Sequence, residues 1–186
     1  MRKMIDVDFG SSRYDELVEL RYKVLLEPLG LKFLDMYREK EMNYLHIGCV
    51  ESLDDNLVGG LMLVPVNDEE IRLMQVAVDS KYQREGVGLS LIHISEPTRL
   101  LSIRLMQVAV DSKYQREGVG REMVKYAEKR AREAGYSRIV MHAMLSVVHF
   151  YEKLGYRQEG DIFEENGITF ARMGKDLSDG RNFSRP

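Results

Sequence analysis

The chain has 186 residues, of which 44% are hydrophobic and 31% are charged. This composition is that of one globular domain, and it excludes a disordered tail and a collagen-like rod. Lys and Arg total 27 against 30 Asp and Glu, a net charge of −3. Nucleic acid is therefore not an expected partner, because proteins that bind phosphate backbones usually carry an excess of positive charge.

Cysteine content and hydropathy bear on the compartment. The single Cys49 cannot form an intrachain disulfide, and the chain opens without a basic-then-apolar leader. No apolar run approaches the roughly 18 residues that a membrane span requires. We therefore expect a cytoplasmic protein that has no membrane partner.

The first predicted elements are a strand and a helix. Apolar and acidic residues alternate over 5–9, the pattern of a strand with one face in water. A capping pattern at Ser12 and Asp15 then begins a helix, whose apolar residues recur at three- and four-residue spacing until Pro28 ends it.

Three strands are predicted next, over 44–51, 57–66 and 71–78. Turn-forming residues at 54–56 and 67–70 separate them, so we expect an antiparallel meander. The third strand is apolar along nearly its whole length. This suits a strand in the middle of a sheet, buried on both faces.

One segment of the sequence occurs twice without a single difference. Residues 71–88 and 103–120 both read IRLMQVAVDSKYQREGVG, at an offset of 32. Solenoid repeats diverge in sequence and recur at least three times, so this pair does not indicate a solenoid. We expect a single domain over 1–186, in which 71–102 is a duplicated or inserted segment.

The linker between the copies, residues 89–102, matches nothing else in the chain. Its first part, Leu89 to Arg99, resembles a translated adapter of the kind used to build sequencing libraries. This resemblance favours an artefact of assembly or cloning over a natural tandem duplication. Removing residues 71–102 from the 186 leaves a parent of 154 residues, and removing 89–120 leaves the same sequence.

The C-terminal third alternates helices and strands. Residues 121–136 carry apolar side chains on one face of a predicted helix and charged ones, including Glu128, on the other. A strand over 138–143, a short helix capped by Ser146 and a last strand over 168–173 follow. The fold class is therefore α+β, with a mixed, mostly antiparallel central sheet, flanking helices and one strand-helix-strand crossover.

The most specific motif lies where the second repeat copy runs into a helix. It consists of Gln115, Arg116, Glu117, Gly118, Val119, Gly120 and Arg121. Glycine lets the backbone approach an anion closely, and the N–H groups of the helix's first turn point toward that anion. The P-loop of NTPases needs Lys and then Ser or Thr after its last glycine, and the dinucleotide fingerprint needs a third small residue where Met123 stands. The sequence therefore predicts a phosphate-binding loop that belongs to neither of these two families.

This loop resembles the Q/R-x-x-G-x-G/A motif of the GNAT superfamily of acyl-CoA-dependent N-acyltransferases. A second segment, residues 146–163, resembles the next motif of that family, whose F-Y-x-K-x-G-F/Y core matches residues 150–156. With the opening strand and helix, the resemblance covers nearly all of the 154-residue parent. It implies a GNAT-like fold in which the crossover carries the CoA-binding loop.

The resemblance also implies which residues bind acetyl-CoA and act on it. In the family, the strand before the loop offers its backbone to pantetheine, and the loop binds the pyrophosphate. Tyr151 matches a tyrosine that lies near the CoA sulfur in many members and acts there as general acid. A backbone N–H near Ala109 or Val110 would bind the oxyanion. The implied cofactor-binding residues are Val108, Ala109, Val110, Gln115, Arg116, Glu117, Gly118, Val119, Gly120, Arg121 and Ser146, although many members have Asn where Ser146 stands.

No motif marks the general base or a metal site. His46, Glu51 and His142 are candidates for the base that takes a proton from the amine. His142 and His149 have no third ligand at a telling spacing, so no metal is expected.

We therefore expect an enzyme that moves an acetyl group from acetyl-CoA to a primary amine by direct attack in a ternary complex. The acceptor would be a small molecule or a peptide, and a homodimer is compatible with the sequence. The alternative is a non-catalytic acyl-CoA or nucleotide binding module whose acceptor side the insert disrupts. The second repeat copy is expected to carry the loop, because only that copy continues into a helix, whereas Pro97 would break a helix after the first. Which copy forms the central strand is open at this point.

Overall fold

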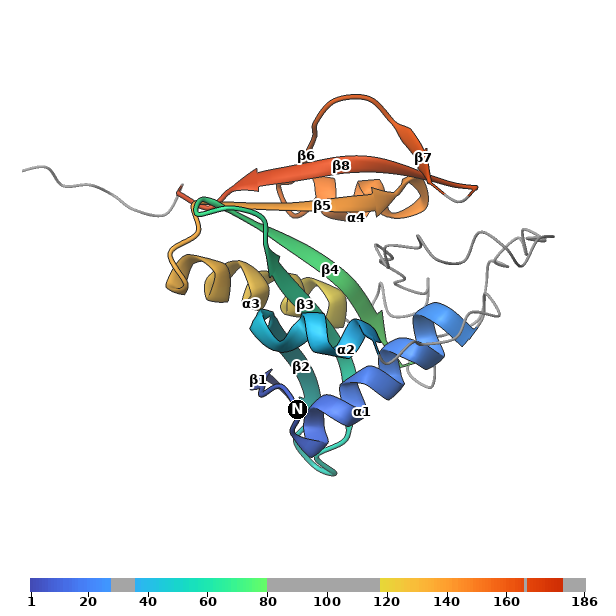
Figure 1. The fold of residues 1–186 in the computed structure, drawn as a ribbon, viewed down its shortest axis with the longest axis vertical. Coiled ribbons are helices and arrows are strands. Elements are labelled where there is room, and N and C mark those ends of the chain that lie inside the picture. Colours follow the sequence, from blue (N-terminus) through green and yellow to red (C-terminus); the bar gives the residue numbers. More distant parts are fainter. Residues whose placement is uncertain (28–35, 80–117, 166, 179–186) are drawn as a thin grey trace, which may run out of the picture.

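The computed structural model describes residues 1–27, 36–79, 118–165 and 167–178. These residues form an eight-stranded sheet with helices on both faces (Figure 1). The strands are β1 (Arg2–Val7), β2 (Leu45–Glu51), β3 (Leu57–Pro65), β4 (Glu70–Val78), β5 (Arg138–Met144), β6 (Arg157–Gln158), β7 (Phe163–Glu165) and β8 (Ile168–Asp176). The helices are α1 (Ser12–Arg21), the π-helix η1 (Tyr22–Leu26), α2 (Met36–Lys40), the 3₁₀-helix η3 (Glu41–Asn43), α3 (Val119–Glu133), the 3₁₀-helix η7 (Leu145–Val147) and α4 (Val148–Glu152).

The strand order is β1-β2-β3-β4-β5-β8-β6, with β7 also paired to β8. Neighbouring strands are antiparallel except for β4 and β5, which are parallel. The chain between β4 and β5 contains α3, so these three elements form the crossover. The predicted α+β class, with its mixed, mostly antiparallel sheet and flanking helices, is confirmed.

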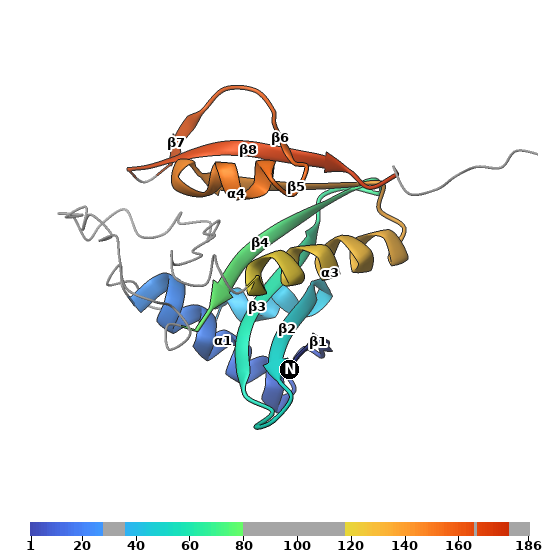
Figure 2. The same ribbon diagram turned by 180° about the vertical axis from the view of Figure 1, so that it is seen from behind.

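The helices form two layers around the sheet. Helices α1 and α2 lie on one face, and α3 lies on the other (Figures 1 and 2). The largest core cluster joins α3 to the sheet through Met123 and Ala127, and it includes Tyr151 of α4. On the opposite face, a Cβ on Gly60 would clash with Leu17 Cδ1, so glycine at this position lets α1 lie close to β3.

Three local predictions from the sequence are wrong. The N-cap of α1 is Ser11, whose hydroxyl accepts a hydrogen bond from the Tyr14 N–H at 3.1 Å, and Ser12 already lies inside the helix. Ser146 lies inside η7 and does not cap α4, whose N-cap Val147 makes no side-chain cap bond. Glu128 does not face water: its carboxylate is buried and accepts hydrogen bonds from Lys175.

The central strand β4 comes from the first copy of the repeat. Residues 71–78 of β4 belong to that copy, whereas residues 103–117 of the second lie outside the described residues. A short turn joins β3 to β4, and in it Asn67 Oδ1 accepts from the N–H groups of Glu69 and Glu70 at 2.9 and 2.8 Å. A connection longer by 32 residues would cost about 2 kcal/mol more in loop-closure entropy. Chain connectivity therefore favours the first copy beside β3.

Candidate functional site

Strands β4 and β5 pair over a short stretch and then separate. Their ladder joins residues 70–72 to residues 138–140. Beyond Arg72 the described partner of β4 is β3 alone, and beyond Val140 the described partner of β5 is β8 alone. Figure 1 shows the two strands diverging from this point. Two facing strand edges that do not pair with each other can pair with an extended ligand.

Strand β4 contains a β-bulge in the part that has left β5. Its ladder with β3 shifts between Gly60 and Met62, so that Leu61 alone faces two residues, Gln75 and Val76. Gln75 is buried and has φ +52°, in the left-handed region that side chains other than glycine rarely adopt. A bulge interrupts the ladder and turns backbone groups away from it, and strained backbone of this kind concentrates at functional sites.

Helix α3 begins at the predicted loop glycines. Its N-cap is Gly118, at φ +81°, and the first intrahelical bond runs from the Glu122 N–H to Gly118 O at 2.9 Å. A Cβ on Gly118 would have no described atom within 4 Å. Val119 and Gly120 are buried, and Arg121 is exposed in the first turn. The first N–H groups of any helix lack intrahelical acceptors, so this end of α3 favours an anion.

The first turns of α3 pack beside the end of β4. Gly59 pairs with Val78, and a Cβ on Gly59 would stand 2.7 Å from Met123 Sδ and 3.2 Å from Ala77 O. Glycine at position 59 therefore gives Met123 its place against the sheet. The N-terminus of α3 and the C-terminal end of β4 lie on the same side of the molecule (Figure 2).

Tyr151 is completely buried on α4. Its hydroxyl has no hydrogen-bond partner among the described residues. Its ring packs edge-on against Phe150 and Tyr156, with centroid distances of 5.0 and 5.6 Å. Burial raises the pKa of Tyr151 well above its usual value, because a phenolate here would lose its hydration. The side chain therefore keeps its proton, and a buried O–H of this kind is unusual without a partner.

The remaining predicted binding residues fall into two groups. Ser146 is exposed and follows closely after the end of β5. The first-copy counterparts of the predicted strand residues are Val76, Ala77 and Val78, which are buried in β4 at and beyond the bulge. The predicted residues that lie outside the described part of the chain are Val108, Ala109, Val110, Gln115, Arg116 and Glu117.

The three candidates for the general base lie on two strands. His46 is buried on β2, with Nε2 at 3.0 Å from Glu41 O, and burial lowers its pKa. Glu51 ends β2 at the turn into β3. His142 lies on β5 beyond the last pair with β4, and its ring meets Phe163 edge-on at 4.9 Å. Of the three, only His142 lies on a strand that borders the separation.

A buried ion pair under α1 is absent from the sequence predictions. Arg21 Nη2 and Glu41 Oε2 lie 2.8 Å apart, and the two residues are 1% and 3% exposed. The Tyr14 hydroxyl donates to the same carboxylate oxygen at 2.9 Å, and Arg21 Nη1 lies 3.2 Å from Met62 Sδ. The pair joins α1 to η3 and β3. No motif marks it, because charged side chains are mostly exposed.

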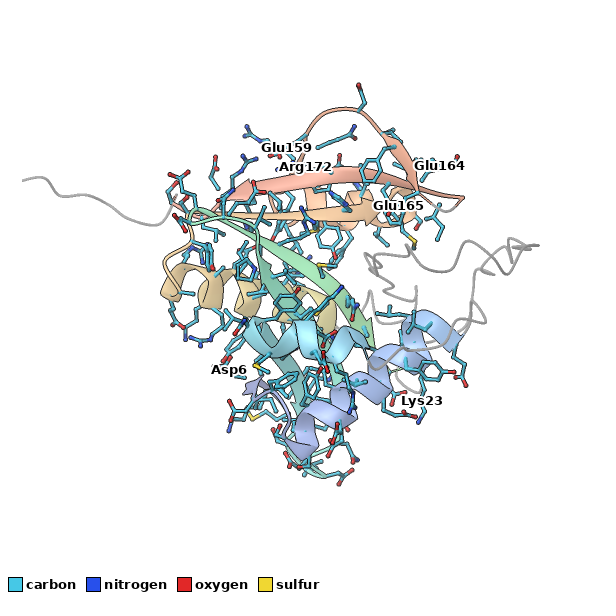
Figure 3. The ribbon with its side chains drawn as sticks, viewed as in Figure 1. Asp6, Lys23, Glu159, Glu164, Glu165 and Arg172 are labelled. Carbon is cyan, nitrogen blue, oxygen red and sulfur yellow. The ribbon has the colours of Figure 1, made fainter. Side chains whose placement is uncertain are left out.

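A second charged group lies on the outer face of β8. Figure 3 shows Arg172 beside Glu159, and their side chains approach to 3.4 Å between Nε and Oε2. Arg172 Nη2 also donates to both carboxylate oxygens of Glu70 at 3.1 Å. Glu159 follows β6, so these contacts hold the segment between β6 and β7 against the sheet.

Within the described ranges, no group of three or more His, Cys, Asp and Glu side chains could hold a metal ion. No helix in the same ranges is long and apolar enough to cross a membrane.

Two family models match the chain, and both describe GNAT acetyltransferases. The model "Acetyltransferase (GNAT) family" matches residues 14–96, and "Acetyltransferase (GNAT) domain" matches residues 98–177. Each match contains one copy of the repeat, and the two meet inside the linker 89–102.

Solved structures share the fold. A protein from Lactobacillus plantarum is 21% identical, covers 95% of this chain and 98% of its own, and has a TM-score of 0.69. An aminoglycoside 6′-N-acetyltransferase complexed with coenzyme A is 18% identical, with 99% of both chains covered and a TM-score of 0.65. A GNAT family acetyltransferase from Elizabethkingia anophelis with acetyl-CoA bound is 14% identical, covers 94% of this chain and 97% of its own, and has a TM-score of 0.58. The two family matches, which together span residues 14–96 and 98–177, show that the chain belongs to the GNAT acetyltransferase superfamily.

Proposed function

We propose that this chain moves the acetyl group of acetyl-CoA to a primary amine by direct attack in a ternary complex. The observation that carries the proposal is the separation of β4 from β5, with the bulge at Gln75 just beyond it and the N-terminus of α3 beside the end of β4. The family supports it, as do two solved relatives whose names state a bound coenzyme A or acetyl-CoA.

In this proposal two parts of one acetyl-CoA molecule contact different elements of the fold. The pantetheine arm has amide groups and lies extended, so it adds to the edge of β4 like a strand. The backbone of 76–78 then takes the role that the sequence assigns to Val108, Ala109 and Val110. The pyrophosphate lies at the start of α3, over Gly118 and Gly120, with Arg121 supplying positive charge at the rim. The loop residues that complete this site are Gln115, Arg116 and Glu117, with Ser146 on the β5 side.

The chemistry requires an electrophile, a place for the oxyanion and a proton for sulfur. The amine nitrogen attacks the thioester carbonyl carbon, and a backbone N–H at the bulge of β4 stabilises the oxyanion. The C–S bond then breaks, and Tyr151 donates its proton to the thiolate. Burial raises the pKa of the phenol, and the same dry surroundings raise that of the leaving thiol, so the proton transfer stays feasible. His142 is the base candidate that borders the site and takes the proton of the amine, directly or through water.

One observation favours the alternative of a non-catalytic acyl-CoA binding module. In this chain 40 residues separate the end of β4 at Val78 from the start of α3 at Val119. In the 154-residue parent the same strand would reach the same helix after only 8 residues. In this alternative the inserted segment disrupts the acceptor side.

An assay of thiol release from acetyl-CoA separates the two functions. The acceptors are a small amine, a polyamine, an aminoglycoside, a peptide with a free N-terminus and a lysine peptide, each tested on this chain and on the 154-residue parent. Amine-dependent thiol release by this chain supports the enzyme. A rise in melting temperature with acetyl-CoA but no release supports the binding module, because a ligand that binds only the folded state stabilises it. A folded sample that shows neither at millimolar acetyl-CoA refutes both.

A further inference from the structure

The end of α4 is a Schellman turn that begins at Tyr151. The Tyr156 N–H donates to Tyr151 O at 3.1 Å and the Gly155 N–H donates to Glu152 O at 2.9 Å, with Gly155 at φ +88°. In such a turn an apolar contact usually joins the first and last residues. Here that contact is the edge-on packing of the rings of Tyr151 and Tyr156. The turn therefore sets both the backbone and one ring neighbour of Tyr151.

Lys175 of β8 donates a hydrogen bond to the carbonyl oxygen of Leu154 in this turn. Its Nζ donates to Leu154 O at 2.7 Å and to both carboxylate oxygens of Glu128 at 2.9 Å. An ammonium group has three N–H donors, and these three acceptors match them. The same Nζ lies 5.4 Å from the centroid of the Tyr156 ring. Lys175 thus connects the last turn of α4 to β8 and α3.

The Lys175–Glu128 pair lies largely out of water. The two side chains are 24% and 7% exposed, so solvent screens their attraction only in part. The other cation that the described residues place near Glu128 is Arg132, with Nη2 at 3.7 Å. Loss of Lys175 would leave Leu154 O without this donor and Glu128 with a poorly placed counter-charge.

We propose that Lys175 is a positioning residue for Tyr151. This proposal rests on the function proposed above, in which Tyr151 protonates the leaving thiolate. The Tyr151 hydroxyl has no partner among the described residues, so its place depends on ring packing and on the turn that Lys175 holds. When that turn loosens, the phenol shifts, and a displacement of about 1 Å costs on the order of a hundredfold in rate.

Four proteins test the proposal: the wild type, Lys175→Met, Tyr151→Phe and the double variant. Lys175→Met is expected to lower kcat roughly 10- to 100-fold while KM for acetyl-CoA stays within about twofold. In the Tyr151→Phe background the same substitution is expected to cause no further loss, because there is no phenol left to position. A general structural role would lower kcat by the same factor in both backgrounds, and that result would overturn the proposal.

Matched variants control for charge and folding. Lys129→Met removes the lysine of an exposed pair on α3, in which Nζ lies 3.6 Å from Glu133 Oε1, and it is expected to leave kcat unchanged. Lys175→Arg keeps a cation and donors within reach of both acceptors, and it is expected to retain most of the activity. Circular dichroism melts show which proteins fold. If Lys175→Met does not, Lys175→Gln takes its place in the four-protein comparison.

The outcomes separate this proposal from the proposed function. A wild type without turnover refutes the function, and this proposal falls with it. Tyr151→Phe at the wild-type kcat refutes the role of Tyr151. A slow Tyr151→Phe together with an unaffected Lys175→Met refutes the positioning role alone.

Discussion

Replacing Glu41 by Leu tests the buried ion pair under α1. The carboxylate accepts from Arg21 at 2.8 Å and from the Tyr14 hydroxyl at 2.9 Å, and all three residues are buried. Removing one partner of a buried ion pair costs about 3–5 kcal/mol, because the other charge stays out of water without compensation. In a chain of this size each kcal/mol corresponds to about 2–4 °C, so Glu41→Leu is expected to lower the melting temperature by roughly 6–20 °C.

A second substitution distinguishes the stranded charge from simple loss of packing. Adding Arg21→Met to Glu41→Leu removes the uncompensated guanidinium, and apolar replacements of buried pairs are often neutral or stabilising. The double variant is therefore expected to recover more than half of the lost stability. Glu19→Leu provides the control, since Glu19 forms an exposed pair with Lys23 on the same side of the fold, at 3.1 Å, worth less than about 1 kcal/mol.

Thermal and urea unfolding, followed by far-ultraviolet circular dichroism, measures five proteins: the wild type, Glu41→Leu, Arg21→Met, the double variant and Glu19→Leu. A loss of stability in Glu41→Leu no larger than that in Glu19→Leu would contradict a stranded buried charge. Simple additivity of the effects of Arg21→Met and Glu41→Leu would contradict it too, because two groups that compensate each other must show a coupling energy.

Three further outcomes are expected. Gly118→Asp should abolish acetyl-CoA binding in calorimetric titrations, because the new carboxylate repels the pyrophosphate at the start of α3. Gly86→Asp should leave binding nearly intact. The opposite result, with Gly86→Asp the damaging change, would assign the phosphate-binding loop to the first copy. Tyr151→Phe should lower kcat far more than it weakens acetyl-CoA binding, whereas equal losses would mark a packing residue. Burial lowers the pKa of His46, so near and below about pH 6.5 the unfolded chain binds a proton that the folded chain does not. As the pH falls below this value, the free energy of unfolding should decrease by up to about 1.4 kcal/mol per pH unit. Melts across this range should show a flatter dependence in His46→Gln but not in His149→Gln, which alters an exposed side chain.

The long elements were predictable because each buries apolar side chains along many residues. Strands β2, β3 and β4 follow the turn signals of the sequence, and β4 also follows its apolar run. Helix α3 follows the four-residue spacing of Met123, Ala127 and Ala131. Strands β6 and β7 have only two and three residues. Strands this short cannot show an alternation of apolar and polar residues. Both form because β8 offers an edge with which they pair.

The site was predictable only in part. The glycine at 118 is visible because a loop that approaches an anion needs it, and Tyr151 is visible through the family resemblance. The bulge at Gln75 is not, since a positive φ usually falls on glycine and nothing local distinguishes this glutamine. Arg21 and Glu41 lie 20 residues apart, and only the tertiary fold brings them together. Which repeat copy forms β4 could not be read from identical side chains, because chain connectivity decides it.

The short connection between β3 and β4 also matters during synthesis. The first copy of the repeat leaves the ribosome 32 residues ahead of the second, an interval of roughly 2–6 s at ordinary elongation rates. A hairpin forms within about 1–10 μs, so β3 and the first copy have ample time to pair before the second copy exists. The order of synthesis therefore decides which copy pairs with β3, although the side chains of the two copies are identical. Refolding from denaturant removes this order, since both copies then compete for β3 from the first moment.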